Sequence, residues 1–299
     1  MTNLGCNTVF FSNLLVPNKI LHKMEKIFKK CKMLKSDRTA VFALITLVFA
    51  FLTFHRNSAW SNAFTLWENT ITKSPSKSRP HTYLALANAK DELFDAALAE
   101  FGIAVAIDPL NVEARYNLGV LYLKTGQYEK AASEFKKAIS IRPDLPESYK
   151  GITNIYLETG QYGIAARYLL DAMRIWPQAI WVHLNLGIAY ARSGDLDKAE
   201  SSLRQANVMD PEDPSVNNSL GNVYMMKGLH GEALKFYIKA AEAPAGGPEP
   251  VFNTAMAYER LGDTRRAVEF YKRFISINPK GYDDSIMAAK ERAAKLDDR

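Results

Sequence analysis

Apolar and small residues recur along this chain with a period of 34 residues. In the unit from Val112 to Leu145 they occur at helical spacing on both sides of Gly126, and Pro143 closes the second run. Apolar residues three or four apart predict amphipathic helices, and such glycines and prolines predict turns and helix ends. Each unit is therefore predicted to be a helix-turn-helix, and the chain an all-α array of stacked units.

Six complete repeats are predicted over residues 78–281. They begin at Ser78, Val112, Pro146, Ile180, Pro214 and Pro248. The twentieth position is always alanine: Ala97, Ala131, Ala165, Ala199, Ala233 and Ala267. A small side chain is expected there because extra methylenes in a tight helix crossing cost about 1–3 kcal/mol. Aromatic residues recur at the eleventh and twenty-fourth positions and are predicted to be core, not a cofactor site.

The repeat register extends to both ends of the array. Pro75 lies 34 residues before Pro109, so residues 57–75 are predicted as an amphipathic helix that forms half a repeat. Residues 282–299 are predicted as a capping helix with one apolar face. The Pro- and Gly-rich stretch 243–250 predicts a loosened joint between the fifth and sixth repeats.

These positions make residues 78–281 resemble the tetratricopeptide repeat family. The resemblance implies a right-handed superhelical solenoid whose concave groove is lined by the first helix of each repeat. It also implies a scaffold that binds proteins or peptides in this groove. Positions two, five, six, nine and twelve of the first helices face the groove in this family. The peptide-binding residues implied are Tyr116, Asn117, Lys150, Asn154, Trp181, Asn185, Asn222 and Asn253.

Asn117, Asn185 and Asn253 share the sixth position. They resemble the asparagine ladder of the repeat domain of O-linked N-acetylglucosamine transferase, where carboxamides pair with peptide bonds. The alternative is that asparagine is simply common at this position. Lys150, with Asn154 and Asn185, also resembles part of the carboxylate clamp of co-chaperone repeats, but two further basic positions of that clamp are serines here.

The stretch 39–54 is uncharged and mostly apolar, so residues 39–55 are predicted as one transmembrane helix. Sixteen residues span only roughly 24 Å, a little less than the usual ~30 Å bilayer core. A buried core helix is the alternative. Residues 1–38 hold eight of the 38 basic residues and two of the 32 acidic ones. The positive-inside rule therefore places this basic segment in the cytoplasm and the repeats in the periplasm or lumen.

The net charge of +6 belongs to residues 1–38, and the remaining chain is neutral. A nucleic-acid groove would need its basic excess in the array, so no nucleic-acid partner is expected. No enzyme activity, cofactor or metal site is predicted, because the five histidines lack ligand spacing and the glycines at the repeat turns occur singly. His183 is predicted to be a structural histidine.

A second resemblance covers residues 53–79. Its motifs are Thr53, Arg56-Asn57, Trp60, Leu66-Trp67, Lys73-Ser74-Pro75 and Arg79. They are similar to the junction in membrane glycosyltransferase-type proteins of the C superfamily that carry these repeats. The many-span catalytic region is absent, so no transferase activity follows. The preferred hypothesis is a single-pass membrane scaffold, and the alternative is a detached C-terminal fragment or accessory subunit that needs a separate glycosyltransferase membrane subunit.

Overall fold

The computed structural model describes residues 35–58 and 62–297, and all its regular elements are α-helices. The chain divides into two units, Met1–Pro75 and Ser76–Arg299. The first unit contains α3 (Lys35–Ser58) and α4 (Ala63–Lys73). The basic segment predicted over residues 1–38 lies, up to residue 34, outside the described residues.

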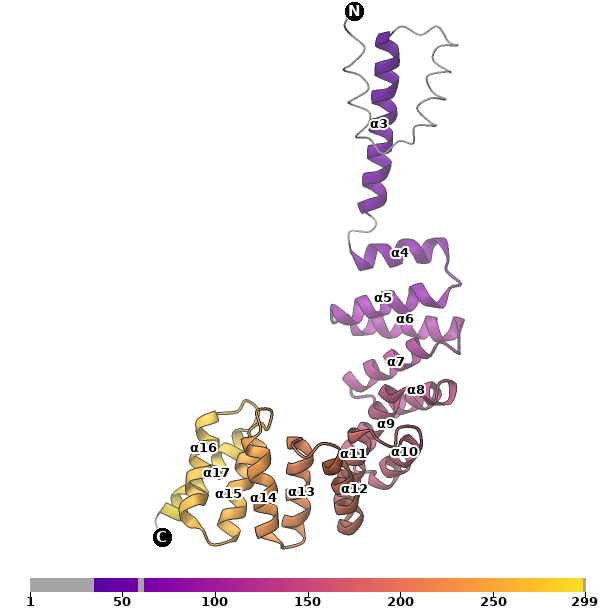
Figure 1. The fold of residues 1–299 in the computed structure, drawn as a ribbon. Coiled ribbons are helices and arrows are strands. Elements are labelled where there is room, and N and C mark those ends of the chain that lie inside the picture. The colour runs from indigo at the N-terminus through magenta and orange to yellow at the C-terminus, as the bar shows by residue number, and fades with distance from the viewer. Residues whose placement is uncertain (1–34, 59–61, 298–299) are drawn as a thin grey trace, which may run out of the picture. The chain divides into compact units, whose positions relative to one another are not determined.

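The second unit consists of helix pairs stacked one after another and a final single helix (Figure 1). The first helices of the pairs are α5 (Ser78–Lys90), α7 (Val112–Lys124), α9 (Pro146–Glu158), α11 (Ile180–Ser193), α13 (Pro214–Met226) and α15 (Glu249–Arg260). The second helices are α6 (Phe94–Ile107), α8 (Tyr128–Ile141), α10 (Tyr162–Ile175), α12 (Leu196–Met209), α14 (His230–Glu242) and α16 (Thr264–Ile277), and α17 (Asp283–Asp297) follows them. The predicted all-α repeat array is confirmed.

The core of the array follows the repeat register. All six alanines at the twentieth position are 0% exposed. The large side chains at the twenty-fourth position are at most 2% exposed: Phe101, Phe135, Leu169, Leu203, Tyr237 and Tyr271. Across the helix pair, Gly119 leaves room for the ring of Phe135 and Gly221 for that of Tyr237, as close packing of an interior requires.

His183 confirms its predicted structural role. It is 7% exposed, and its Nε2 donates a hydrogen bond of 2.9 Å to the carbonyl of Pro177. A buried imidazole with a satisfied ring nitrogen stabilises the start of α11 against the preceding turn.

The fifth and sixth repeats are not loosely joined, contrary to the prediction from the Pro- and Gly-rich stretch 243–250. Nδ2 of Asn218 in α13 donates to Oε1 of Glu249 at 3.1 Å, and Nδ2 of Asn253 in α15 donates to Oδ1 of Asn218 at 2.9 Å. Side chains of the first helices thus cross the joint that the loop composition was expected to weaken. Loop composition reports on the connection only, whereas these bonds lie between the helices it connects.

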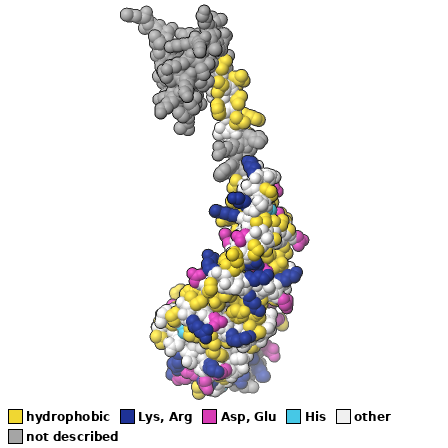
Figure 2. Space-filling model, turned by 90° about the vertical axis from the view of Figure 1, so that its right-hand side faces the viewer, with side chains coloured by type: hydrophobic (Ala, Val, Ile, Leu, Met, Phe, Trp, Pro, Cys, Tyr) yellow, Lys and Arg dark blue, Asp and Glu magenta, His cyan; other side chains and the backbone are white. Residues whose placement is uncertain are grey.

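The N-terminal unit exposes apolar side chains along α3 (Figure 2). Leu47, Phe51 and Phe54 are 67%, 65% and 73% exposed. Among the residues that the structure describes, however, no helix combines the length and apolar character needed to cross a membrane. The transmembrane helix predicted over residues 39–55 is therefore not found among these residues.

α4 begins at a capped end, because Oδ1 of Asn62 accepts a 3.0 Å hydrogen bond from the backbone N–H of Thr65. None of the residues of α4 is buried. Its assignment as half a repeat that continues the array stays a prediction.

Candidate functional site

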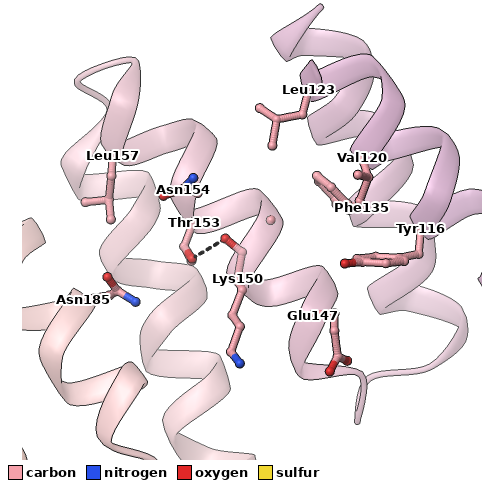
Figure 3. Close-up of a pocket in the computed structure, with 11 residues that line it drawn as sticks. Tyr116, Val120, Leu123, Phe135, Glu147, Lys150, Thr153, Asn154, Leu157 and Asn185 are labelled. Atoms are coloured by element: carbon pink, nitrogen blue, oxygen red, sulfur yellow. Dashed lines mark hydrogen bonds between the residues drawn. The ribbon is translucent and has the colours of Figure 1, made fainter. Parts of the chain in front are cut away.

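A pocket of about 390 Å³ lies on the first helices of the second, third and fourth repeats (Figure 3). α7, α9 and α11 supply all of its lining except one side chain from α8. The lining residues are Tyr116, Val120, Leu123, Phe135, Glu147, Lys150, Gly151, Thr153, Asn154, Leu157 and Asn185. Four of the predicted peptide-binding residues are therefore brought together: Tyr116, Lys150, Asn154 and Asn185.

One wall of the pocket is apolar. Val120 is 39% exposed and Leu123 is half-buried, and half-buried Leu157 lies across the pocket from them (Figure 3). The ring of Tyr116 lies 5.8 Å from the ring of Phe135, which is itself fully buried. Burial raises the pKa of Tyr116, and the carboxylate of Glu147 raises it further, so the hydroxyl keeps its proton and can donate to a ligand. Such a wall offers an apolar ligand a place out of water.

Two glycines allow Phe135 to form the base of the pocket. A Cβ atom added to Gly119 would lie 2.8 Å from the ring of Phe135, and one added to Gly151 would lie 2.6 Å from it. These distances are shorter than carbon atoms tolerate, so both positions must lack a side chain for the ring to fit. Gly151 occupies the sixth position, where three of the other repeats have asparagine, and its lack of a side chain opens the pocket.

We expect Gly151→Ala to lower the free energy of unfolding by about 1–3 kcal/mol, because the buried ring of Phe135 must move. Urea unfolding measures the change. Gly102→Ala is the matched control: Gly102 lies within α6, and an added Cβ meets nothing within 4 Å. That variant should gain roughly 0.5–1 kcal/mol from helix propensity. A similar gain in Gly151→Ala would contradict the tight packing at this site.

The opposite side of the pocket is polar. Nδ2 of Asn154 donates a long hydrogen bond of 3.3 Å to Oε1 of Glu158 on its own helix. The carboxamide of Asn185 makes no side-chain hydrogen bond to any described residue, and it faces the pocket from α11. A half-buried carboxamide in this state can donate and accept at once, which suits a peptide bond.

Two opposite charges also line the pocket. Among the described residues, neither Glu147 nor Lys150 has an oppositely charged group within 4.0 Å. Nζ of Lys150 instead lies 5.3 Å from the centre of the Trp181 ring, a cation–π distance. Trp181 packs 6.1 Å from Trp176 and does not line the pocket.

The three asparagines of the sixth position have different surroundings. Nδ2 of Asn117 donates to the backbone carbonyl of Glu113 at 2.8 Å, within its own helix, and Asn117 does not line the pocket. Asn253 donates across the joint to Asn218, as described above. Of the three, only Asn185 lines the pocket, and the asparagine ladder stays a prediction.

Asn222 belongs to the same network as Asn253, in the fifth and sixth repeats. Its Oδ1 accepts a 2.8 Å hydrogen bond from the hydroxyl of Tyr237 and lies 3.4 Å from Nδ2 of Asn253. Burial and then the charge of Glu249 raise the pKa of Tyr237, so its hydroxyl remains a donor. The groove-facing amides of this region are thus engaged with one another.

Comparison with known families decides the identity of the array. Residues 80–283, most of the chain, match the family model for the C-terminal domain of cilia and flagella-associated protein 70, a tetratricopeptide-repeat domain. The chain belongs to this family. No curated protein matches it.

Solved structures share the fold of this tetratricopeptide-repeat array. PilW, a widely conserved type IV pilus biogenesis factor, is 21% identical with a TM-score of 0.59, over 71% of this chain and 97% of PilW. PilF of Pseudomonas aeruginosa is 16% identical with a TM-score of 0.56, over 72% and 96%. YrrB, a repeat protein with an unusual peptide-binding site, is 20% identical with a TM-score of 0.53, over 62% and 95%. At these identities the likeness shows the fold alone.

Tetratricopeptide repeats form a scaffold fold, and neither the family match nor the solved structures identify a catalytic domain in this chain. The glycosyltransferase resemblance of residues 53–79 has no support from the family match or from these structures. A separate glycosyltransferase subunit as partner therefore has no basis beyond the sequence motifs.

Sequence reasoning missed the apolar wall of the pocket. Val120 is at position nine of its repeat, and Leu123 and Leu157 are at position twelve, all of which face the groove in tetratricopeptide repeats. The register was therefore sufficient to find them. The predicted site contains polar and aromatic residues alone, and Phe135 is predicted only as core.

Proposed function

We propose that this chain is a scaffold that binds a protein or peptide segment in the groove formed by α7, α9 and α11. The observation that carries the proposal is the pocket itself, in which first helices of three successive repeats present an apolar wall and the carboxamides of Asn154 and Asn185 to one space. An extended segment lying across these helices would bury apolar surface and pair its backbone with the amides. The peptide-binding site of YrrB shows only that this fold can serve such a function.

Photo-crosslinking tests the proposal. A photoreactive amino acid at Asn154, which is exposed in the pocket, should capture a protein or peptide partner in cells that express the chain. The control is the same amino acid at Glu129, an exposed position in the first turn of α8 outside the pocket. Capture that is equal at both positions, or absent at Asn154, would refute groove binding.

The groove amides divide into two groups with different expected roles. Asn185→Ala should weaken capture of the partner because its carboxamide faces the pocket without a side-chain partner among the described residues. Asn253→Ala should leave capture unchanged and lower stability instead, since its Nδ2 is engaged by Asn218. The reverse result would place the ligand in the fifth and sixth repeats and reinstate the asparagine ladder.

The proposal for the N-terminal unit is attachment to a membrane through α3. Exposed Leu47, Phe51 and Phe54 and the uncharged stretch 39–54 support it. The basic residues of 1–38 favour a cytoplasmic N-terminus, with the repeats in the periplasm or lumen. Alkaline extraction of membranes tests the attachment: the chain should stay in the pellet, and Phe51→Lys should release it. Release of the unaltered chain would overturn the proposal.

A further inference from the structure

The pocket has features that select one class of side chain, and the inference rests on the proposed peptide-binding function. Its volume of about 390 Å³ lies near the lower end of the usual ~300–1,000 Å³ range of ligand pockets, so it has room for a large side chain and part of the adjacent backbone. The side chains of Tyr116, Val120 and Leu123 gather around the base formed by Phe135, and Leu157 lies across the pocket from them (Figure 3). In this view the charged ends of the lining residues point away from that apolar end.

The charges of the pocket oppose an ionic ligand. Glu147 and Lys150 lie one helical turn apart on α9 and contribute opposite charges to the same lining. A ligand carboxylate attracted by Lys150 would also meet the field of Glu147, and a ligand ammonium would meet the converse. The two charges act in opposite directions on such a group, so neither sign of ionic group is attracted by both of them. A neutral side chain carries no charge, so neither Glu147 nor Lys150 repels it.

The carboxamide of Asn185 supplies the second feature. It borders the pocket on the α11 side, opposite the apolar residues of α7 (Figure 3). Asn154, one turn before Leu157 on α9, lies between them. A peptide bond next to an inserted side chain would therefore meet at least one carboxamide able to donate and accept.

We propose that the pocket holds one large neutral apolar side chain, of leucine, isoleucine, methionine or phenylalanine size, from an extended segment of a partner protein, with the adjacent peptide bond paired to Asn185. The apolar residue supplies affinity through burial against Val120, Leu123 and Leu157. The carboxamide fixes the position of the backbone without reading its sequence. The ligand is therefore an internal segment, with no requirement for a carboxyl terminus.

Selection from a library of random peptides tests this inference, with the full chain as bait and the peptides displayed internally, without free carboxyl termini. The enriched peptides should share one large apolar residue. Val120→Glu places a charge on the apolar wall and should weaken their binding roughly tenfold or more. Asn185→Ala should weaken it by a smaller factor. The matched control is Val208→Glu, at a position in α12 that is 77% exposed and outside the pocket, and it should bind as the unaltered chain does.

The outcomes separate the two proposals. The apolar-pocket inference is overturned if the enriched peptides share an acidic or basic residue. It is also overturned if the Val120→Glu variant binds them as well as the unaltered chain does. In both cases peptide binding itself stands. An absence of any enriched peptide counts against the proposed function as well. Circular dichroism shows whether each variant has folded. If Val120→Glu does not fold, Asn185→Ala provides the second test.

Discussion

Phe135→Ala is expected to lower the free energy of unfolding by about 3–5 kcal/mol, the usual loss when a fully buried aromatic side chain is truncated. Phe135 is 0% exposed and packs with Ile152, Ile155 and Leu169 in one buried cluster. It is also held between the second and third repeats by Gly119 and Gly151. Alanine would leave a cavity that these rigid helices cannot fill.

Urea unfolding of the full chain, followed by far-ultraviolet circular dichroism, measures this loss. Tyr128→Ala is the matched control, because Tyr128 lies in the first turn of the same helix and is 36% exposed. It should cost less than about 1 kcal/mol. Equal losses in the two variants would show that the destabilisation comes from α8 as a helix and not from the packing of Phe135.

The same substitution also tests the architecture of the pocket. Without the ring of Phe135, the base of the pocket opens into the new cavity. Tyr116 also loses the aromatic ring whose centre lies 5.8 Å from its own. Binding of any captured peptide should then weaken even under conditions in which the protein remains folded. Core packing and ligand binding are thus coupled through one side chain.

The fold could be predicted from the sequence because its core repeats. Ala131 and Ala165 recur 34 residues apart, each with a large residue four positions later, and stacked helix pairs bury all of these residues. His183 was assigned to the core by its position in the same register. Such positions are determined by the nearest helices, which the period specifies.

The site could be predicted only in part, because a groove residue depends on neighbours that do not repeat. Asn185 and Asn253 occupy the same repeat position, yet Asn253 donates to Asn218 at the fifth position of the preceding repeat, whereas Asn185 has Lys150 at that position. The pattern predicts that both face the groove. It cannot predict which amide is already bonded, since that depends on side chains one repeat away.

The end of the array depends on α17, which covers the last helix pair. Ile286, Ala289, Ala293 and Leu296 are buried against the cluster that contains Tyr271. Nη1 of Arg292 and the hydroxyl of Tyr271 both donate to Oε2 of Glu259, at 2.9 and 2.7 Å.

These bonds make the end of the array sensitive to acid. Burial acts to raise the pKa of Glu259, but the hydrogen bonds from Tyr271 and Arg292 outweigh it, and the pKa is lowered. This stabilisation is fully present above the unfolded carboxyl pKa and is lost as the pH falls through the lowered pKa of the folded state.

Ile286→Asp is expected to detach α17 and to destabilise the end of the array by about 3 kcal/mol or more, because an unpaired carboxylate would replace a buried apolar side chain. The adjacent residue provides the control: Met287 lies on the same helix, is 67% exposed, and should tolerate aspartate within about 0.5 kcal/mol. The backbone amides of α17 and α16 should lose protection from hydrogen exchange first, because only neighbouring helices contact one another in a stacked array. If Met287→Asp lost as much protection as Ile286→Asp, α17 would not dock through the face that contains Ile286 and Leu296, and Tyr271 and Phe274 would need another cover.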